Sequence, residues 1–298
     1  MTNIQDQLPF WESFPNLAPQ SLPEQVGKRI PWHSDAASPR SSQTFCVSAF
    51  GCLIGNPNCD VICQRLGALV PLCGPTTDTK WEVHLEYTDR SLLNEFVGTA
   101  TQIDVLLAGR NCAITIESKL VSDADAGLGT CSKYKNGDCK GYYGPGSDKK
   151  SPATWCVLER WDGKRTPRLY WTLGRSYFRP EVFRVQGPDV GDVCPLRGSH
   201  YQLMRNFLSA AAFAGRKKLR DFGTLVICPK AKSGTLASQV KAFKENILLP
   251  QFAEKVRLVF YDDYLAMLRE SDDHHLKRTA DFLHVRMNTE TGTPRLVD

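Results

Sequence analysis

The sequence contains no run of apolar residues that approaches membrane-spanning length, and its first ten residues lack the basic-then-apolar pattern of a secretory signal. We therefore expect a cytoplasmic protein with no membrane partner. The net charge of +5 is small for 298 residues and excludes a chain coated in basic side chains. Binding of a polyanion would need a local basic groove instead. No internal repeat is evident, and the length suits one large domain or two small ones.

The eleven cysteines include no C-x2-C pair, the spacing that most strongly indicates a metal site. Their odd number also argues against a complete disulfide framework. Four of them fall in a polar stretch where a hydrophobic core has little use for them: Cys131, Cys139, Cys156 and Cys194. Four thiolates can hold a structural Zn²⁺ or an iron–sulfur cluster, and unligated thiols are the alternative interpretation.

The stretch at residues 101–120 reads as two apolar strands joined by a tight turn, and its acidic side chains are Asp104 and Glu117. Alternate residues of a strand share a face, so Glu117 and Lys119 should project together while the neighbouring isoleucines point the other way. If the hairpin brings Asp104 beside them, two carboxylates and one ammonium group converge at one spot.

Such a cluster suits a divalent cation, a water molecule and a phosphate. Mg²⁺ prefers oxygen ligands and keeps several waters, so one or two carboxylates are enough to hold it. The bound metal lowers the pKa of a water and neutralises charge on a phosphodiester. A lysine beside it can orient the water or the phosphate. The alternative is an exposed strand face on which Glu117 and Lys119 form an ordinary ion pair.

One pattern resembles the D-x(n)-(D/E)-x-K signature of the PD-(D/E)xK nuclease superfamily: Asp104, followed thirteen residues later by the triplet ESK (117–119). Gln102 and Ile103 precede the aspartate, where many members carry proline. Four further segments are similar to a bacterial restriction-endonuclease-like branch: SSQTFCVSAFG (41–51), WEVHLEY (81–87), GTATQIDVLL (98–107) and CPLRGSHYQLMRN (194–206). The resemblance covers about residues 41–270. It implies an α/β fold with a restriction-endonuclease-like core, a mixed sheet flanked by helices, that cleaves DNA with Mg²⁺ or Mn²⁺.

The chain divides into three parts. Residues 1–40, rich in Pro, Gln and Ser, are predicted to form an N-terminal extension, residues 41–272 the nuclease domain, and residues 273–298 a polar tail. Residues 121–195 form a cysteine-containing insertion. Predicted helices lie at 43–53, capped by Ser41 or Ser42, and at 60–70, 201–214, 236–249 and 261–268. Predicted strands lie at 81–87, 103–107, 112–120, 168–173, 223–228, 256–260 and 282–287.

A third carboxylate is expected on the strand at 81–87, whose alternation places Glu82, His84 and Glu86 on one side. We prefer Glu86 as the additional metal ligand, direct or through water, because it lies in the part that resembles the family. Solvent-facing glutamates are the alternative.

Polar residues of two predicted helices are further candidates. Gln43 can contact the site, or serve in capping and packing. Gln202 and Arg205 lie one turn apart, and the resemblance implies that they reach the metal site and a phosphate. For Arg205, a surface cation is the alternative.

Contacts with DNA phosphates are expected from two basic stretches. Lys133 and Lys135 alternate with tyrosines in a Gly-rich loop, which suits phosphate contact and base stacking. Lys217 and Lys218 belong to the run GRKKLR (215–220) at a helix end, where the dipole favours cations anyway. Ordinary solvated surfaces explain both stretches equally well.

These observations predict a Mg²⁺-dependent deoxyribonuclease with a role in restriction, defence or repair. Asp104 and Glu117 would hold the metal, Lys119 would position the nucleophile or the phosphate, and Glu86 and Gln202 would assist. Two alternatives remain open: a nuclease-like DNA-binding protein that does not cut, and a structural member of a defence or repair complex. A homodimer is an open expectation as well.

Overall fold

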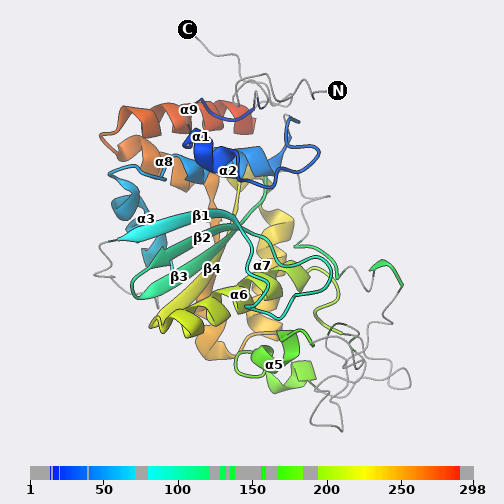
Figure 1. Ribbon diagram of the computed structural model, residues 1–298. Helices are drawn as coiled ribbons and strands as arrows, with labels where there is room; N and C mark the ends of the chain where they lie inside the picture. The colour runs from blue at the N-terminus through cyan, green and yellow to red at the C-terminus, as the bar shows by residue number, and fades with distance from the viewer. Residues whose placement is uncertain are drawn as a thin grey trace.

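The computed structural model describes residues 14, 16–19, 21–38, 40–70, 80–120, 128–131, 135–137, 156, 158, 167–183 and 194–288. Its centre is a five-stranded sheet ordered β1-β2-β3-β4-β5 (Figure 1). The strands are β1 (Trp81–Tyr87), β2 (Ile103–Gly109), β3 (Cys112–Ser118), β4 (Asp221–Cys228) and β5 (Val256–Phe260). β1, β2 and β3 form an antiparallel meander, and β4 and β5 add to it in parallel. This mixed sheet confirms the predicted α/β class.

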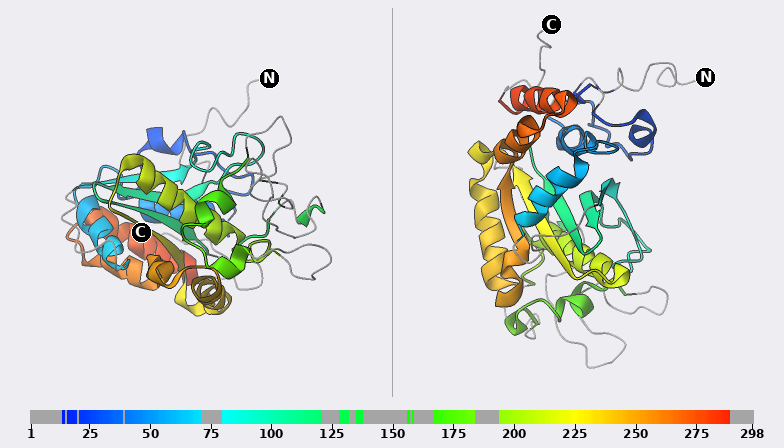
Figure 2. Two further views of the ribbon diagram at one scale, coloured as in Figure 1. Left: turned by 90° about the horizontal axis from the view of Figure 1, so that it is seen from below. Right: turned by 90° about the vertical axis from the view of Figure 1, so that its left-hand side faces the viewer.

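Helices cover both faces of the sheet (Figure 2). One face carries α2 (Ser42–Gly51), α3 (Cys59–Ala68), α8 (Tyr261–Glu270) and α9 (His274–Asn288). The other carries α5 (Tyr170–Gly174), α6 (Tyr201–Lys217) and α7 (Gly234–Asn246). Shorter helices are α1 (Glu24–Gly27), η4 (Pro180–Phe183), η5 (Lys230–Lys232) and η6 (Pro250–Lys255). Within the described part of the chain, no helix combines the length and apolar character needed to cross a membrane.

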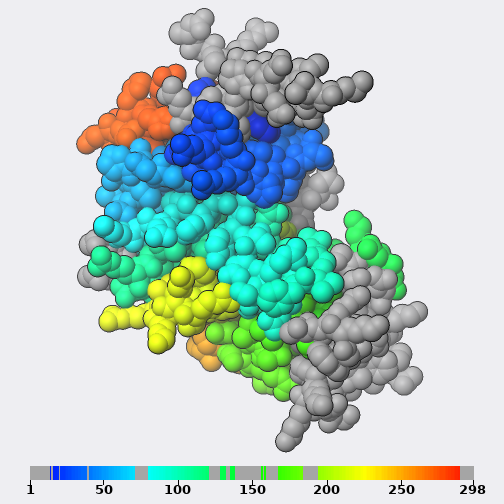
Figure 3. All heavy atoms as spheres, viewed as in Figure 1, coloured from blue at the N-terminus to red at the C-terminus, as the bar shows by residue number. Residues whose placement is uncertain are grey.

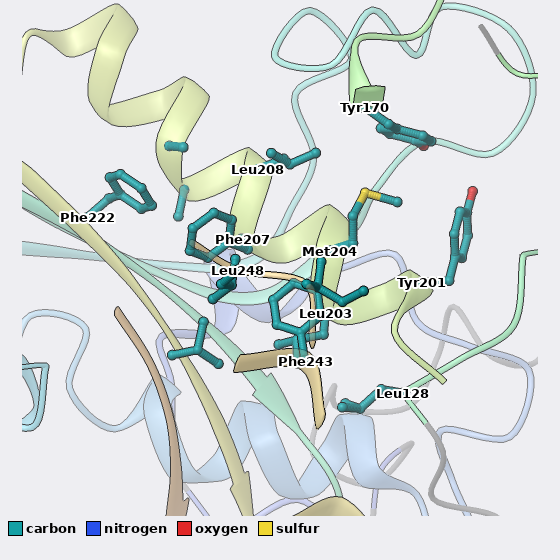
Figure 4. Packing of buried hydrophobic residues seen from close by; sticks show 14 of the residues in the cluster. Leu128, Tyr170, Tyr201, Leu203, Met204, Phe207, Leu208, Phe222, Phe243 and Leu248 are labelled. Carbon is teal, nitrogen blue, oxygen red and sulfur yellow. The ribbon is translucent and has the colours of Figure 1, made fainter. Parts of the chain in front are cut away.

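Aromatic packing fixes α6 against its face of the sheet (Figure 4). The ring of Phe207 in α6 lies edge-to-face with Phe222 of β4, at a centroid distance of 5.3 Å, and with Phe243 of α7, at 6.3 Å. Such pairs add to the free energy of simple burial. Phe207 thereby fixes α6 against the start of β4 and against α7.

The predicted cap of the first helix is Ser41, whose Oγ accepts a hydrogen bond of 3.3 Å from the backbone N of Thr44. α2 is buried on nearly all sides. Its outer side chain Val47 packs against Leu22 and Ile30. The described part of residues 1–40, the predicted N-terminal extension, is therefore a layer packed over α2.

Residues 274–288 of the predicted polar tail form the helix α9. Leu276, Ala280 and Leu283 recur at the spacing of one helix face and are buried against α2 and α8. The strand predicted at 282–287 is part of this helix.

The stretch at 168–173 forms the start of α5 and not the predicted strand. Tyr170 and Trp171 are consecutive and both buried in the core shared with α6. A strand would point consecutive side chains to opposite faces, whereas one turn of helix brings both toward the same core.

Candidate active site

Three carboxylates form one row across β1, β2 and β3. Leu85 pairs with Val105 and Tyr87 with Ile103, so Glu86 lies opposite Asp104. Val105 also pairs with Ile116, which places Asp104 opposite Glu117 at the next position of the β2–β3 ladder. The hairpin thus brings Asp104 and Glu117 together, as the sequence predicts.

Glu117 is fully enclosed by hydrogen-bond donors. Its side chain is 1% exposed, and its Oε1 lies 2.8 Å from Lys119 Nζ and accepts a hydrogen bond of 2.6 Å from Gln202 Nε2. Oε2 accepts a hydrogen bond of 2.6 Å from Nδ2 of Asn206. The expected common face of Glu117 and Lys119 is confirmed, and Ile116 packs into the opposite core. These contacts fix the rotamer of the carboxylate.

Lys119 is held between the strand and α6. Its Nζ also donates to Oε1 of Gln202 at 3.1 Å, so this amide bridges lysine and glutamate. Burial acts to lower the pKa of Lys119, but the charges of Glu117 and Asp104 outweigh it and raise that pKa above its usual value. The ammonium group therefore stays charged at neutral pH.

Asp104 sits in an unfavourable environment for a bare negative charge. Burial raises its pKa well above the usual value, and the charge of Glu117 raises it further, while Lys119 acts in the opposite direction. Its Oδ2 accepts a hydrogen bond of 2.7 Å from the backbone N of Ser118. A nearby cation would relieve the repulsion between the two carboxylates.

Glu86 does not share a side with Glu82 and His84, which corrects the predicted alternation. Its φ angle is +51°, and this left-handed residue reverses the alternation of the strand. His84 and Tyr87 consequently lie on one side, with ring centroids 5.7 Å apart, and Tyr87 packs against Phe213 of α6.

The side chain of Glu86 is 7% exposed and lies among amides. Burial raises the pKa of Glu86 to about 7, with a smaller contribution from the charge of Glu117, while hydrogen bonds from Gln43 and Gln102 lower it. Gln102 Nε2 donates to Glu86 Oε2 at 2.5 Å. Gln43 of α2 also accepts from the backbone N of His33 at 2.8 Å, which ties the N-terminal layer to the site.

Asn206 is the site residue that the sequence analysis missed. It follows Gln202 by four residues on α6, so both amides face β3. That helical spacing was the available signal, but a lone asparagine on a mostly apolar helix reads as an ordinary residue.

Arg205 has a supporting position in the structure, and its predicted phosphate contact stays a prediction. Its Nε donates to Oγ1 of Thr101 at 2.8 Å, and its Nη2 lies 3.6 Å from Oε1 of Glu95. The side chain is 16% exposed, and its guanidinium lies 5.3 Å from the ring centroid of Tyr201. It links α6 to the loop between β1 and β2.

The predicted DNA-binding lysines of α6, Lys217 and Lys218, lie away from the carboxylates. Lys217 is fifteen residues beyond Gln202 on α6, about 22 Å along the helix axis. With Lys80 and Arg110 it lines an open groove of about 480 Å³ beside β1, on the face seen in Figure 3. Lys218 ends α6, Lys135 is exposed, and Lys133 lies outside the described residues.

The four candidate thiols are described in part, because Cys139 lies outside the described residues. Cys131, Cys156 and Cys194 are half-buried against the core on the α6 face. Cys131 N donates to the Arg197 carbonyl, and Arg197 N donates to the Cys194 carbonyl. Among the described side chains, no three His, Cys, Asp or Glu are grouped as a metal-binding set. The Zn²⁺ or iron–sulfur assignment stays a prediction.

Comparison with known proteins adds one finding. A family model described as "Restriction Endonuclease associating with ARP" matches residues 8–286. No curated protein and no solved structure matches the chain. The match spans nearly the whole sequence, including the N-terminal layer and α9. The chain belongs to this restriction endonuclease family.

Proposed function

We propose that the chain is a Mg²⁺-dependent deoxyribonuclease of the PD-(D/E)xK type that hydrolyses DNA phosphodiester bonds in restriction, defence or repair. The observation that carries this proposal is the meeting of Asp104 and Glu117 on adjacent strands, with Lys119 Nζ 2.8 Å from Glu117 Oε1. Membership of a restriction endonuclease family supports the same reaction class.

The acidic row suits a divalent cation. Burial and the charge of Glu117 raise the pKa of Asp104 and of Glu86, so a cation that offsets these negative charges would stabilise the folded protein. Asp104 and Glu117 would hold Mg²⁺ or Mn²⁺, and Glu86 would assist directly or through water. Two carboxylates suffice because Mg²⁺ keeps several of its waters. The metal would supply an activated water and neutralise charge on the phosphate.

The remaining residues position these groups. Gln202 and Asn206 hold the Glu117 carboxylate from α6, which restricts it to one orientation. Lys119, kept protonated by Glu117 and Asp104, would orient the attacking water or the scissile phosphate.

DNA binding is proposed for the basic surface around the groove of Lys80, Arg110 and Lys217. Lys133, Lys135 and Lys218 are further candidates from the sequence. Lysine and arginine contacts with phosphates give sequence-independent affinity that falls with salt. Association with an ARP component is proposed for this chain on the family description, and a homodimer is the other assembly proposed.

The test is cleavage of circular and linear DNA by the purified chain, with Mg²⁺, with Mn²⁺ and with EDTA. We expect metal-dependent cutting by the wild type. Asp104→Ala and Lys119→Ala should abolish it while circular dichroism shows an intact fold. Unchanged cutting by both variants would remove the assignment, and DNA binding without cutting by the wild type would favour a binding protein.

A further inference from the structure

Two large apolar side chains stand exposed on the loop that joins β1 to β2. Phe96 is 57% and Val97 52% exposed. In the part of the chain that the structure describes, two other large apolar residues are exposed, Val61 at 57% and Val285 at 43%, and they lie in different helices. Exposed apolar surface raises the free energy of a protein in water, and a ligand that covers two adjacent apolar side chains lowers it.

The loop of residues 88–102, here called the Phe96 loop, is anchored by the buried carboxylate of Glu95. This side chain is 1% exposed and accepts hydrogen bonds from the backbone N of Thr101, at 2.6 Å, and from its Oγ1, at 2.9 Å. The Tyr170 hydroxyl donates to the same carboxylate. Arg168 Nη1 lies 3.3 Å from it. The residue directly before Phe96 is therefore fixed from several sides.

Two guanidinium groups also bind the carbonyls around the tip. Arg90 Nη1 donates to the carbonyls of Glu95, at 2.7 Å, and Gly98, at 2.9 Å. Arg168 Nη2 donates to those of Val97, at 3.0 Å, and of Thr99, at 3.1 Å. A tip held in this way has little backbone entropy left to lose when a ligand covers it.

The Phe96 loop lies at the same end of the sheet as the acidic row, because it connects the strand of Glu86 to the strand of Asp104. Asp104 is the seventh residue after Val97, which limits the distance between their Cα atoms to about 25 Å. Arg205, one turn after Gln202 on α6, contacts both Glu95 and Thr101 of the loop. The loop belongs to the face shown in Figure 3 (cyan).

From this geometry we propose that Phe96 and Val97 form a wedge that packs against unstacked bases of DNA held at the acidic row. The inference rests on the proposed function and names the part of the substrate that the loop contacts. Apolar side chains inserted at a base step open it, and aromatic rings stack on any base without regard to sequence.

Charge around the wedge favours a polyanion over a neutral apolar partner. The loop itself carries Asp89, Arg90 and Glu95, and three arginines from two other segments contact it: Arg168 before α5, and Arg205 and Arg216 of α6. Asp89 and Glu95 are both paired with arginines, so the surplus charge at the loop is positive. Phosphates on either side of an opened base step would meet this surplus.

The test uses a series of short duplexes with 2-aminopurine at successive positions, whose fluorescence rises on unstacking. The protein is the full chain with Asp104→Asn, which prevents cleavage, in Mg²⁺. We expect a fluorescence increase at one or two positions, lost in Phe96→Ala, with DNA affinity about 5-fold to 100-fold weaker. Phe96→Trp should retain the signal. Val61→Ala, an equally exposed apolar residue on α3, is the matched control and should change nothing.

Outcomes separate the two proposals. In one outcome the wild type cuts DNA and Asp104→Asn binds it, but adding Phe96→Ala to Asp104→Asn changes neither affinity nor fluorescence. The wedge proposal is then wrong, and the proposed nuclease function is unaffected. A Phe96→Ala defect restricted to binding of a protein partner would equally overturn the wedge. If the wild type neither binds nor cuts DNA, the proposed function fails first.

Discussion

The side-chain amide of Asn206 donates a hydrogen bond of 2.6 Å to Oε2 of Glu117, from a helix that begins 83 residues after β3 ends. Asn206→Ala removes this donor and leaves a buried carboxylate oxygen unsatisfied. We expect nuclease activity to fall about 10-fold to 100-fold, as for other groups that orient a metal ligand. Steady-state cleavage assays at saturating Mg²⁺ measure this loss.

The matched control for this variant is Ser209→Ala, which changes a small buried polar residue on the same helix. It should retain activity within about 2-fold. Equal activities for Asn206→Ala and Ser209→Ala would show that the amide does not orient Glu117.

Metal removal should expose the repulsion within the acidic row. Burial and the charge of Glu117 raise the pKa of Asp104, so its ionised form destabilises the metal-free protein at pH 7. Asp104→Asn keeps an acceptor for Ser118 N and removes the charge. In EDTA we expect its Tm to exceed that of the wild type by about 2–4 °C, or about 1 kcal/mol.

Addition of Mg²⁺ should reverse this order. Binding to the folded wild type raises its free energy of unfolding by about 2.7 kcal/mol at a concentration 100-fold above Kd. Asp104→Asn should gain much less. Scanning calorimetry measures the Mg²⁺-induced shift in Tm of both proteins. A shift of the same size in both would contradict the placement of metal at Asp104.

Arg286 connects α9 to the N-terminal layer and should be essential for stability. It is 2% exposed and donates to the carbonyls of Asn16, at 2.6 Å, and Ser41, at 2.8 Å, and to Thr44 Oγ1 at 2.9 Å. Arg286→Ala leaves these buried acceptors unpaired, so we expect the free energy of unfolding to fall by about 3 kcal/mol. Urea denaturation measures the change.

Arg278→Ala on the same helix is the control, because that side chain is exposed. Its effect should stay within about 0.5 kcal/mol. If the two variants unfold at the same urea concentration, the contacts of Arg286 contribute no net stability.

Asp273 precedes α9 and should make stability depend on pH in the acid range. The backbone N of Leu276 donates to its Oδ1 at 3.0 Å, and this is the main cause of a pKa lowered from 3.8. The ionised form is thus favoured by folding. Its contribution is present above pH 3.8 and is lost as the pH falls through the lower folded-state pKa.

Asp273→Ala should therefore cost about 1 kcal/mol at pH 7, as for other helix caps. The difference from wild type should persist to about pH 5 and shrink toward pH 3, as the wild-type carboxyl protonates. Urea unfolding at several pH values tests this, with the exposed Asp272→Ala as control. A constant difference at all pH values would rule out a role for the charge.

Part of the candidate site could be predicted because it depends on local periodicity. A strand places alternate residues on one face, so the sequence alone predicts that Glu117 and Lys119 meet, and the structure puts them 2.8 Å apart. The same rule failed for Glu86, because one residue with positive φ reverses the alternation. No residue pattern in the sequence predicts that Glu86 adopts a left-handed backbone conformation.

The remaining differences come from contacts between distant segments. The pattern of α9 contains Leu276, Ala280 and Leu283 at helical spacing, yet its polar composition suggested a tail. The sequence also gives no sign that the guanidinium of Arg205 lies 3.6 Å from the carboxylate of Glu95, over a hundred residues earlier. Pairings of this kind depend on the whole fold.

The sequence by itself determined the α/β class, the hairpin and the acid–lysine pair at its end, because backbone periodicity and strand length act over neighbouring residues. Only the tertiary structure decided which helix covers Glu117, on which side of the sheet Glu86 lies, and that Phe96 is exposed on a loop fixed by arginines. The physical reason is that these features depend on packing of α6 and on buried charges finding partners far along the chain.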